Sequence, residues 1–130
     1  MRLRQFLAAF AITALLATGA TVIPGTTPTA AAAANYWGAI AWNYNGRTAY
    51  AVNYHSQNGA VRAAKARCGR NCGWIGFYRS CGAAAYKFSG HRTRVGTARG
   101  YATRTGAQRA AKRKAGYGSH IRAWACTAGR

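Results

Sequence analysis

The chain contains one segment of sequence twice, and this internal repeat limits its possible folds more than any other feature. The stretch "AVRAAKARCG" at residues 60–69 returns as "AQRAAKRKAG" at residues 107–116, with six of ten positions identical. A duplication of this size predicts two supersecondary units that pack against each other. The likeness extends on both sides of this stretch, and it pairs 37–46 with 81–90, 54–69 with 101–116, and 74–81 with 120–126.

Each copy has the pattern of two strands, a helix and a third strand. Large residues alternate with small ones, which predicts strands, and Asn45-Gly46 predicts the turn between the first two. Because many of the small residues are alanines, we expect both faces of these strands to be covered. The predicted fold class is α+β, with two β-β-α-β repeats (37–80 and 81–126) in a pseudo-twofold relation, antiparallel sheets and two helices. The alternating large residues of the first copy are Ile40, Trp42 and Tyr44, then Tyr50, Val52 and Tyr54.

The repeated stretch itself predicts a helix in each copy. Ser56 and Thr103 stand where its N-cap belongs. Small apolar residues recur at helical spacing and predict a buried face, which would let the helix lie close to its sheet. This stripe consists of Ala60, Ala63, Ala64 and Cys68 in the first copy and of Ala107, Ala110, Ala111 and Ala115 in the second. The second copy carries four cations on or beside the opposite face: Arg109, Lys112, Arg113 and Lys114.

The N-terminus has the pattern of an export signal. A basic start, "MRLRQ", precedes an apolar stretch and an alanine-rich exit with small-x-small cleavage points near Ala32 to Ala34. A membrane anchor is the alternative, because the apolar stretch approaches spanning length. With cleavage, residues 1–34 are removed, and residues 35–130 form a single two-repeat domain with a charge of +17. We therefore expect a secreted protein.

All four cysteines lie in this domain, and an even number of cysteines in an exported chain predicts disulfides. In the repeat alignment, Cys68 and Cys72 correspond to Ala115 and Ser119, so both are missing together from the second copy. That pattern predicts a Cys68–Cys72 bridge. The remaining two cysteines, Cys81 and Cys126, would then form a second bridge that ties the copies together. The other two pairings remain open.

The motifs "WGAIAW", "CGAAAY" and "WAC", together with the Ala-x-x-Ala-Ala-x-x-x-Cys helix from Ala60 to Cys68, resemble a family of small secreted bacterial proteins. This family is domain of unknown function 4189, and the likeness covers roughly Tyr36 to Cys126. The resemblance implies a secreted bacterial α+β module with paired repeats and disulfides, and it implies no catalytic residues. Family members carry acidic residues, and often cysteines where Ala115 and Ser119 stand here. The extreme basicity is therefore expected to be a specialisation of this chain.

The chain contains 19 Lys and Arg but no Asp or Glu, which excludes several kinds of chemistry. A glycosidase needs paired carboxyl groups, and a Ser-His-Asp triad needs its acid. Calcium and magnesium sites built on carboxylates are excluded as well. We expect no cofactor, no metal and no enzymatic activity.

The positive charge is uneven, which favours binding to an anionic polymer. Residues 35–81 hold six Lys and Arg, whereas residues 82–130 hold eleven. Most of these are Arg, whose planar fork suits phosphate. Candidate partners are wall teichoic acid, extracellular nucleic acid or an anionic lipid surface, without recognition of a nucleotide sequence. The predicted polyanion-binding residues are Arg92, Arg94, Arg99, Arg104, Arg109, Lys112, Arg113 and Lys114.

Other interpretations of these residues remain open. The cations could form only a solvated surface, or they could attack membranes if an apolar face were exposed. The aromatic residues could stack on bases, although their alternation favours packing between strands. A ribonuclease-like site would use two of His55, His91 and His120. A zinc site would combine His55 or His120 with cysteines, and a Cys-His hydrolase would need a free thiol.

Overall fold

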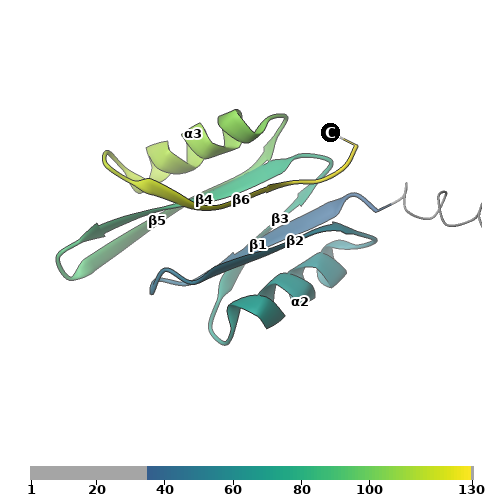
Figure 1. Ribbon diagram of the computed structural model, residues 1–130, viewed down its shortest axis with the longest axis horizontal. Coiled ribbons are helices and arrows are strands. Elements are labelled where there is room, and N and C mark those ends of the chain that lie inside the picture. The colour runs from purple at the N-terminus through teal and green to yellow at the C-terminus, as the bar shows by residue number, and fades with distance from the viewer. Residues whose placement is uncertain (1–34, 130) are drawn as a thin grey trace, which may run out of the picture. The chain divides into compact units, whose positions relative to one another are not determined.

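The computed structural model describes residues 35–129, which form one compact unit (Figure 1). The predicted signal peptide, residues 1–34, lies outside the described residues. The predicted order of elements is confirmed in both copies. The first copy consists of β1 (Trp37–Trp42), β2 (Thr48–Tyr54), α2 (Gln57–Cys68) and β3 (Gly73–Tyr78), and the second of β4 (Cys81–Ser89), β5 (Arg92–Tyr101), α3 (Arg104–Ala115) and β6 (His120–Cys126).

Both helices begin and end with the same local interactions. The Ser56 hydroxyl accepts a hydrogen bond from the Gly59 amide at 3.0 Å, and the Thr103 hydroxyl accepts one from the Gly106 amide at 3.0 Å. These side chains satisfy amides that a helix N-terminus leaves without an intrahelical partner. At the other end, Gly116 has a φ of 108°, a conformation that side chains rarely adopt. The hydrogen bonds of Ser56 and Thr103 confirm the predicted N-caps.

Each copy forms its own antiparallel three-stranded sheet, and the first strand of the copy lies in the middle. The orders are β2-β1-β3 and β5-β4-β6. Figure 1 shows α2 covering one sheet and α3 covering the other, with the two sheets between the helices. Ala39 and Ala41 pack against α2, whereas Ile40, between them in sequence, packs with residues of the second sheet. The α+β class and the two-sided covering of the strands are confirmed, and the pseudo-twofold relation stays a prediction.

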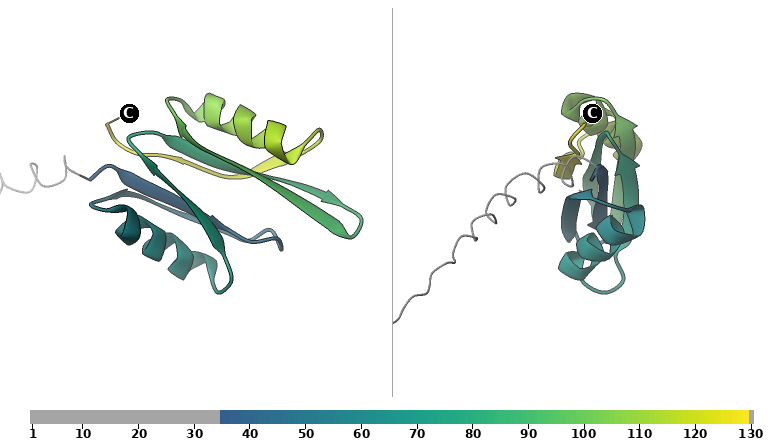
Figure 2. Two further views of the ribbon diagram at one scale, coloured as in Figure 1. Left: turned by 180° about the vertical axis from the view of Figure 1, so that it is seen from behind. Right: turned by 90° about the vertical axis from the view of Figure 1, so that its right-hand side faces the viewer.

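Small differences between the copies explain why the offset of the alignment changes along the chain. The hairpin of β4 and β5 is longer than that of β1 and β2, and it extends beyond the other strands (Figure 2). Ala84 of β4 pairs with Ala123 of β6, whereas Ala85 of β4 pairs with Ile121. Arg122 is therefore an extra residue in β6. Such a β-bulge locally disrupts the ladder and bends the strand. Arg122 therefore has no counterpart in β3.

The structure contains the Cys68–Cys72 and Cys81–Cys126 disulfides, as predicted. The second bridge nevertheless does not tie the two copies together, so that part of the prediction is wrong. Cys81 is the first residue of β4 and lies opposite Cys126 in the β4–β6 ladder, inside the second sheet. Strand β3 ends earlier, at Tyr78, because Arg79 adopts a φ of 50° and turns the chain. Cys81 therefore belongs to the second copy rather than to the end of the first.

Candidate anion-binding surface

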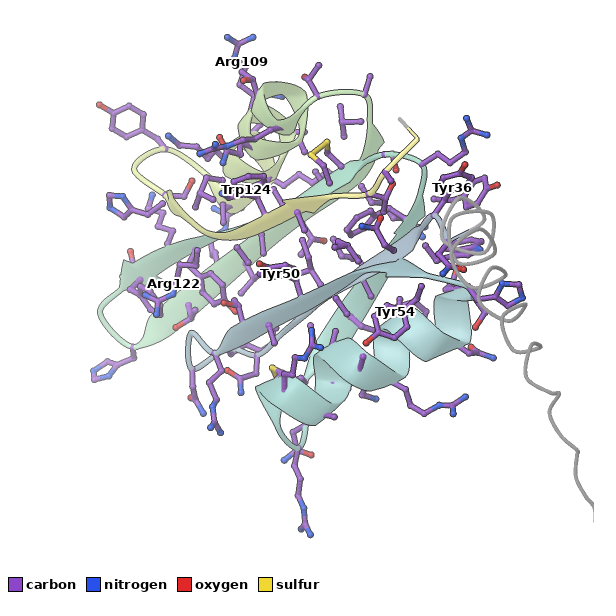
Figure 3. All side chains as sticks on the ribbon, turned by 45° about the vertical axis from the view of Figure 1, so that its right-hand side comes forward. Tyr36, Tyr50, Tyr54, Arg109, Arg122 and Trp124 are labelled. Carbon is purple, nitrogen blue, oxygen red and sulfur yellow. A yellow bond between two sulfur atoms is a disulfide. The ribbon has the colours of Figure 1, made fainter. Side chains whose placement is uncertain are left out.

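The alanines of α3 determine which cations face solvent. Ala107, Ala110, Ala111 and Ala115 are buried against the second sheet. The sheet can approach this closely because a Cβ at Gly96 would overlap the Ala111 carbonyl oxygen. Since residues three and four apart share a helix face, Arg109, Lys112 and Arg113 lie on the remaining sides, and all three are exposed. Figure 3 shows Arg109 pointing away from the molecule.

Lys114 differs from the other three cations of this helix. Its ammonium group donates a hydrogen bond to the Thr97 carbonyl oxygen on β5 at 2.9 Å. At helical spacing Lys114 lies on the side of the alanine stripe and not opposite it, although its side chain is exposed like those of the other three. The expectation that all four cations lie on or beside the outer face is wrong for Lys114.

Two further cations lie near the C-terminal end of α3, and a third lies on the same face of β5. A Cβ at Gly116, the C-cap, would lie 3.5 Å from an Arg94 guanidinium nitrogen and 3.7 Å from the Lys87 side chain. Arg92 lies two residues from Arg94 on the same strand, so its side chain is on the same face of the sheet. Cations are favourable there because the helix C-terminus carries partial negative charge. Lys87 was not among the predicted site residues.

A shallow depression of about 620 Å³ lies beside the end of α3. The loop after the helix forms one side of it, and this loop is held by the buried Ser119 hydroxyl, which donates to the Lys112 carbonyl oxygen at 3.2 Å. Tyr117 in the same loop is 96 % exposed. The cations around the depression are Arg109, Lys112 and Arg113, with His120 on the loop side.

Two predicted site residues lie elsewhere. Arg99 of β5 donates from its guanidinium group to the Gly76 carbonyl oxygen on β3 at 3.4 Å, where the edge strands β3 and β5 of the two sheets lie together. The guanidinium carbon of Arg104 lies 3.9 Å from the centre of the Trp124 ring. Five of the eight predicted residues therefore share one side of the molecule. Together with Lys87 they form a set that we call the α3 cationic surface. It consists of Lys87, Arg92, Arg94, Arg109, Lys112 and Arg113.

The interpretation of the aromatic residues as strand packing holds only in part. Trp42 and Tyr54 are partly buried, and both pack with the core. Tyr44 contacts Trp42 edge-on, with the ring centres 5.4 Å apart. Tyr44 and Tyr50 are nevertheless 61 % and 52 % exposed, so packing in the core does not account for them. Alternation in a strand places a residue on one face, but it does not reveal whether a neighbouring sheet extends far enough to cover it.

The disulfides exclude two of the sites that the sequence left open, the zinc site with cysteine ligands and the Cys-His hydrolase. Both pairs of cysteines are oxidised, so no thiolate remains for zinc or for a Cys-His hydrolase. Within residues 35–129, no three His, Cys, Asp or Glu side chains group as metal ligands do. His55 immediately precedes the Ser56 cap of α2, His91 lies in the β4–β5 turn, and His120 begins β6.

None of the helices between residues 35 and 129 is both long and apolar enough to span a membrane.

Comparison with known protein families identifies one family over these residues. The model of the family described as Domain of unknown function (DUF4189) matches residues 37–126, from the start of β1 to the end of β6. The chain belongs to this family. The DUF4189 match thus covers both repeats, both helices and both disulfides. No curated protein and no solved structure matches the chain.

Proposed function

We propose that this DUF4189 protein is a secreted, non-enzymatic module that binds anionic polymers through the α3 cationic surface. The observation that carries the proposal is the gathering of six cations on one side of a chain that has no acidic residue. Without Asp or Glu, none of these cations can be neutralised by an acidic side chain. A polyanion that meets the surface releases its own counterions and gains affinity from each neutralised charge.

The kind of cation supports a partner that bears phosphate or sulfate. Four of the six residues are Arg, and a guanidinium group binds such an oxyanion with two parallel hydrogen bonds. Wall teichoic acid, extracellular nucleic acid and anionic lipid headgroups all offer phosphate outside a cell. The two disulfides suit an oxidising compartment, in which these partners occur.

The first repeat offers a matched control for this proposal. Arg62 and Lys65 on α2 align with Arg109 and Lys112 on α3, and Arg70 follows α2 closely. All three are exposed. Changing these three residues to Gln removes as much charge as changing Arg109, Lys112 and Arg113. The comparison therefore separates the position of the charge from its amount.

The experiment is a salt titration of binding to a labelled DNA duplex and to heparin. We expect the variant R109Q/K112Q/R113Q to lower the slope of log affinity against log salt by about 2 to 3 on the duplex, since each phosphate contact contributes about 0.9. The variant R62Q/K65Q/R70Q should change the slope little. Equal losses in the two variants would show that diffuse net charge is responsible and would overturn the proposal.

A further inference from the structure

A groove lies where the edges of the two sheets meet. Strand β2 is an edge strand of the first sheet and β6 of the second, and the two strands lie side by side (Figure 3). The groove between them has a volume of about 780 Å³, and Tyr50, Val52, Arg67, Arg122 and Trp124 contribute to its lining. A volume in the range of about 300–1,000 Å³ accommodates a small-molecule-sized group such as a nucleotide.

Two arginines are held in this groove by backbone atoms. The Arg67 guanidinium donates to the Tyr50 carbonyl oxygen at 2.7 Å, and the Arg122 Nε donates to the Gly46 carbonyl oxygen at 3.2 Å. A guanidinium group has five N–H donors, so each arginine keeps donors for a ligand. Arg122 reaches the groove because it is the bulge residue of β6. Ordered cations without acidic partners favour a phosphate-bearing ligand.

The groove also presents aromatic surface. Tyr50 is 52 % exposed and Trp124 is 39 % exposed, and the Arg104 guanidinium lies over the Trp124 ring. The register places Gly76 in β3 where Trp124 stands in β6, because each pairs with an equivalent alanine of the central strand. In the first repeat, Gln57 lies beside Gly76 in place of an arginine beside a tryptophan. The stack of arginine on tryptophan therefore belongs to the second repeat alone.

We propose that this groove binds single-stranded nucleic acid, with bases against Tyr50 and the Arg104–Trp124 stack and phosphates at Arg67 and Arg122. This inference rests on the proposed function and specifies the class of polymer. Positive grooves with exposed aromatic rings are the usual means of holding a single strand, because every base has a planar face.

Other phosphate polymers fit the groove less well. A duplex hides the faces of its bases in the stack, and teichoic acid has no planar ring to place on an aromatic side chain. A sugar ring packs against an open aromatic face, whereas Arg104 covers one face of Trp124. A base stacks on the plane of that guanidinium group, whereas a phosphate binds at its N–H edge.

The test compares two oligonucleotides with the same number of phosphates. One is a thymidine dodecamer and the other is an abasic dodecamer, and binding is followed by tryptophan fluorescence and by anisotropy of an end label. We expect the wild type to bind the thymidine strand at least tenfold more tightly. The variants Y50A and W124A should each weaken thymidine binding about five- to a hundredfold, since stacking on one aromatic contributes that much per base. Their affinity for the abasic strand should stay unchanged.

Two further variants complete the test. W74A removes another tryptophan, 42 % exposed on β3 at the opposite edge, and should leave thymidine binding unchanged. R104Q leaves Trp124 in place and introduces the residue of the first repeat, so it tests the stack even if W124A fails to fold. Equal affinity of the wild type for the two strands would overturn the groove proposal and leave polyanion binding intact. An equal loss in W74A would also overturn it. No binding to any polyanion would overturn both proposals.

Discussion

The Tyr86 hydroxyl, on the central strand of the second sheet, donates a hydrogen bond to the Asn43 carbonyl oxygen of the first repeat at 2.6 Å. The Arg47 carbonyl oxygen lies 3.3 Å from the same hydroxyl. Both acceptors belong to the segment that connects β1 with β2, and Tyr86 is fully buried. One side chain thus holds the first hairpin against the second sheet, where the buried residues of both repeats meet.

Replacing Tyr86 with Phe should therefore destabilise the whole domain. The change keeps the ring but removes one donor, while the two carbonyl oxygens keep the Gly46 and Asn43 amides as donors. The loss of one hydrogen bond then costs about 0.5–1.5 kcal/mol. Urea unfolding followed by fluorescence would measure this loss. Tyr44→Phe is the control, because Tyr44 is 61 % exposed and its hydroxyl is accessible to water. Equal stabilities of Y86F and Y44F would contradict the importance of this hydrogen bond.

The same hydroxyl predicts a dependence of stability on alkaline pH. Burial raises the pKa of Tyr86 above its ordinary value of about 10. A raised pKa in the folded state means that folding favours the protonated form, so this contribution is complete below pH 10 and is lost as the pH rises through the folded value. The stability difference between wild type and Y86F should shrink above pH 10, by up to about 1.4 kcal/mol per pH unit. A difference that stays constant from pH 8 to pH 11 would contradict this prediction.

The helices could be predicted because their determinants act locally. Ser56 and Thr103 cap the chain three residues ahead, and the alanine stripes repeat within single turns. Lys114 shows where local reasoning fails. Its position beside the stripe follows from helical spacing, but its hydrogen bond to Thr97 depends on the neighbouring edge of the sheet. The close approach of α3 to Gly96 likewise needs the two elements in place.

The groove could not be predicted for a similar reason. It requires β2 and β6 to meet as edges of different sheets, and no pattern within either strand encodes that contact. The position of Arg122 was also hidden from the sequence. The sequence alignment pairs the eight residues 74–81 with the seven residues 120–126, so it shows no extra residue in the second repeat. Only the pairing of β4 with β6 shows that Arg122 is the bulge residue.

The two disulfides should contribute unequally to stability. Cys68–Cys72 spans a sequence separation of 4, whereas Cys81–Cys126 spans 45. In the chain-entropy description, a longer closed loop stabilises more, which predicts losses of about 2 kcal/mol for the short loop and about 4 kcal/mol for the long one. The variant C68A/C72S introduces the residues that the second repeat has, and C81A/C126A removes the other bridge. Thermal unfolding of both variants would check the order, and a larger loss in C68A/C72S would contradict it.

Salt should stabilise the folded protein, because its cations repel one another without any acid to offset them. On α3, Arg109 lies three residues from Lys112 and four from Arg113, and each like-charge pair at this spacing costs about 0.2–0.5 kcal/mol at low salt. Lys112 and Arg113 lie in the last turn of α3, where the helix dipole favours cations and offsets part of this repulsion. The variant R109Q/K112Q/R113Q should therefore be more stable than wild type by no more than about 0.5 kcal/mol at low salt. The gain should disappear at high salt, where the charges are screened within a few ångströms. On α2, R62Q/K65Q/R70Q removes only the close pair of Arg62 and Lys65, so it should gain less. Urea unfolding of the three proteins at low and high sodium chloride measures these differences. A triple α3 variant that is less stable than wild type at low salt would show that these cations support the fold, which would leave them less free to meet a polyanion.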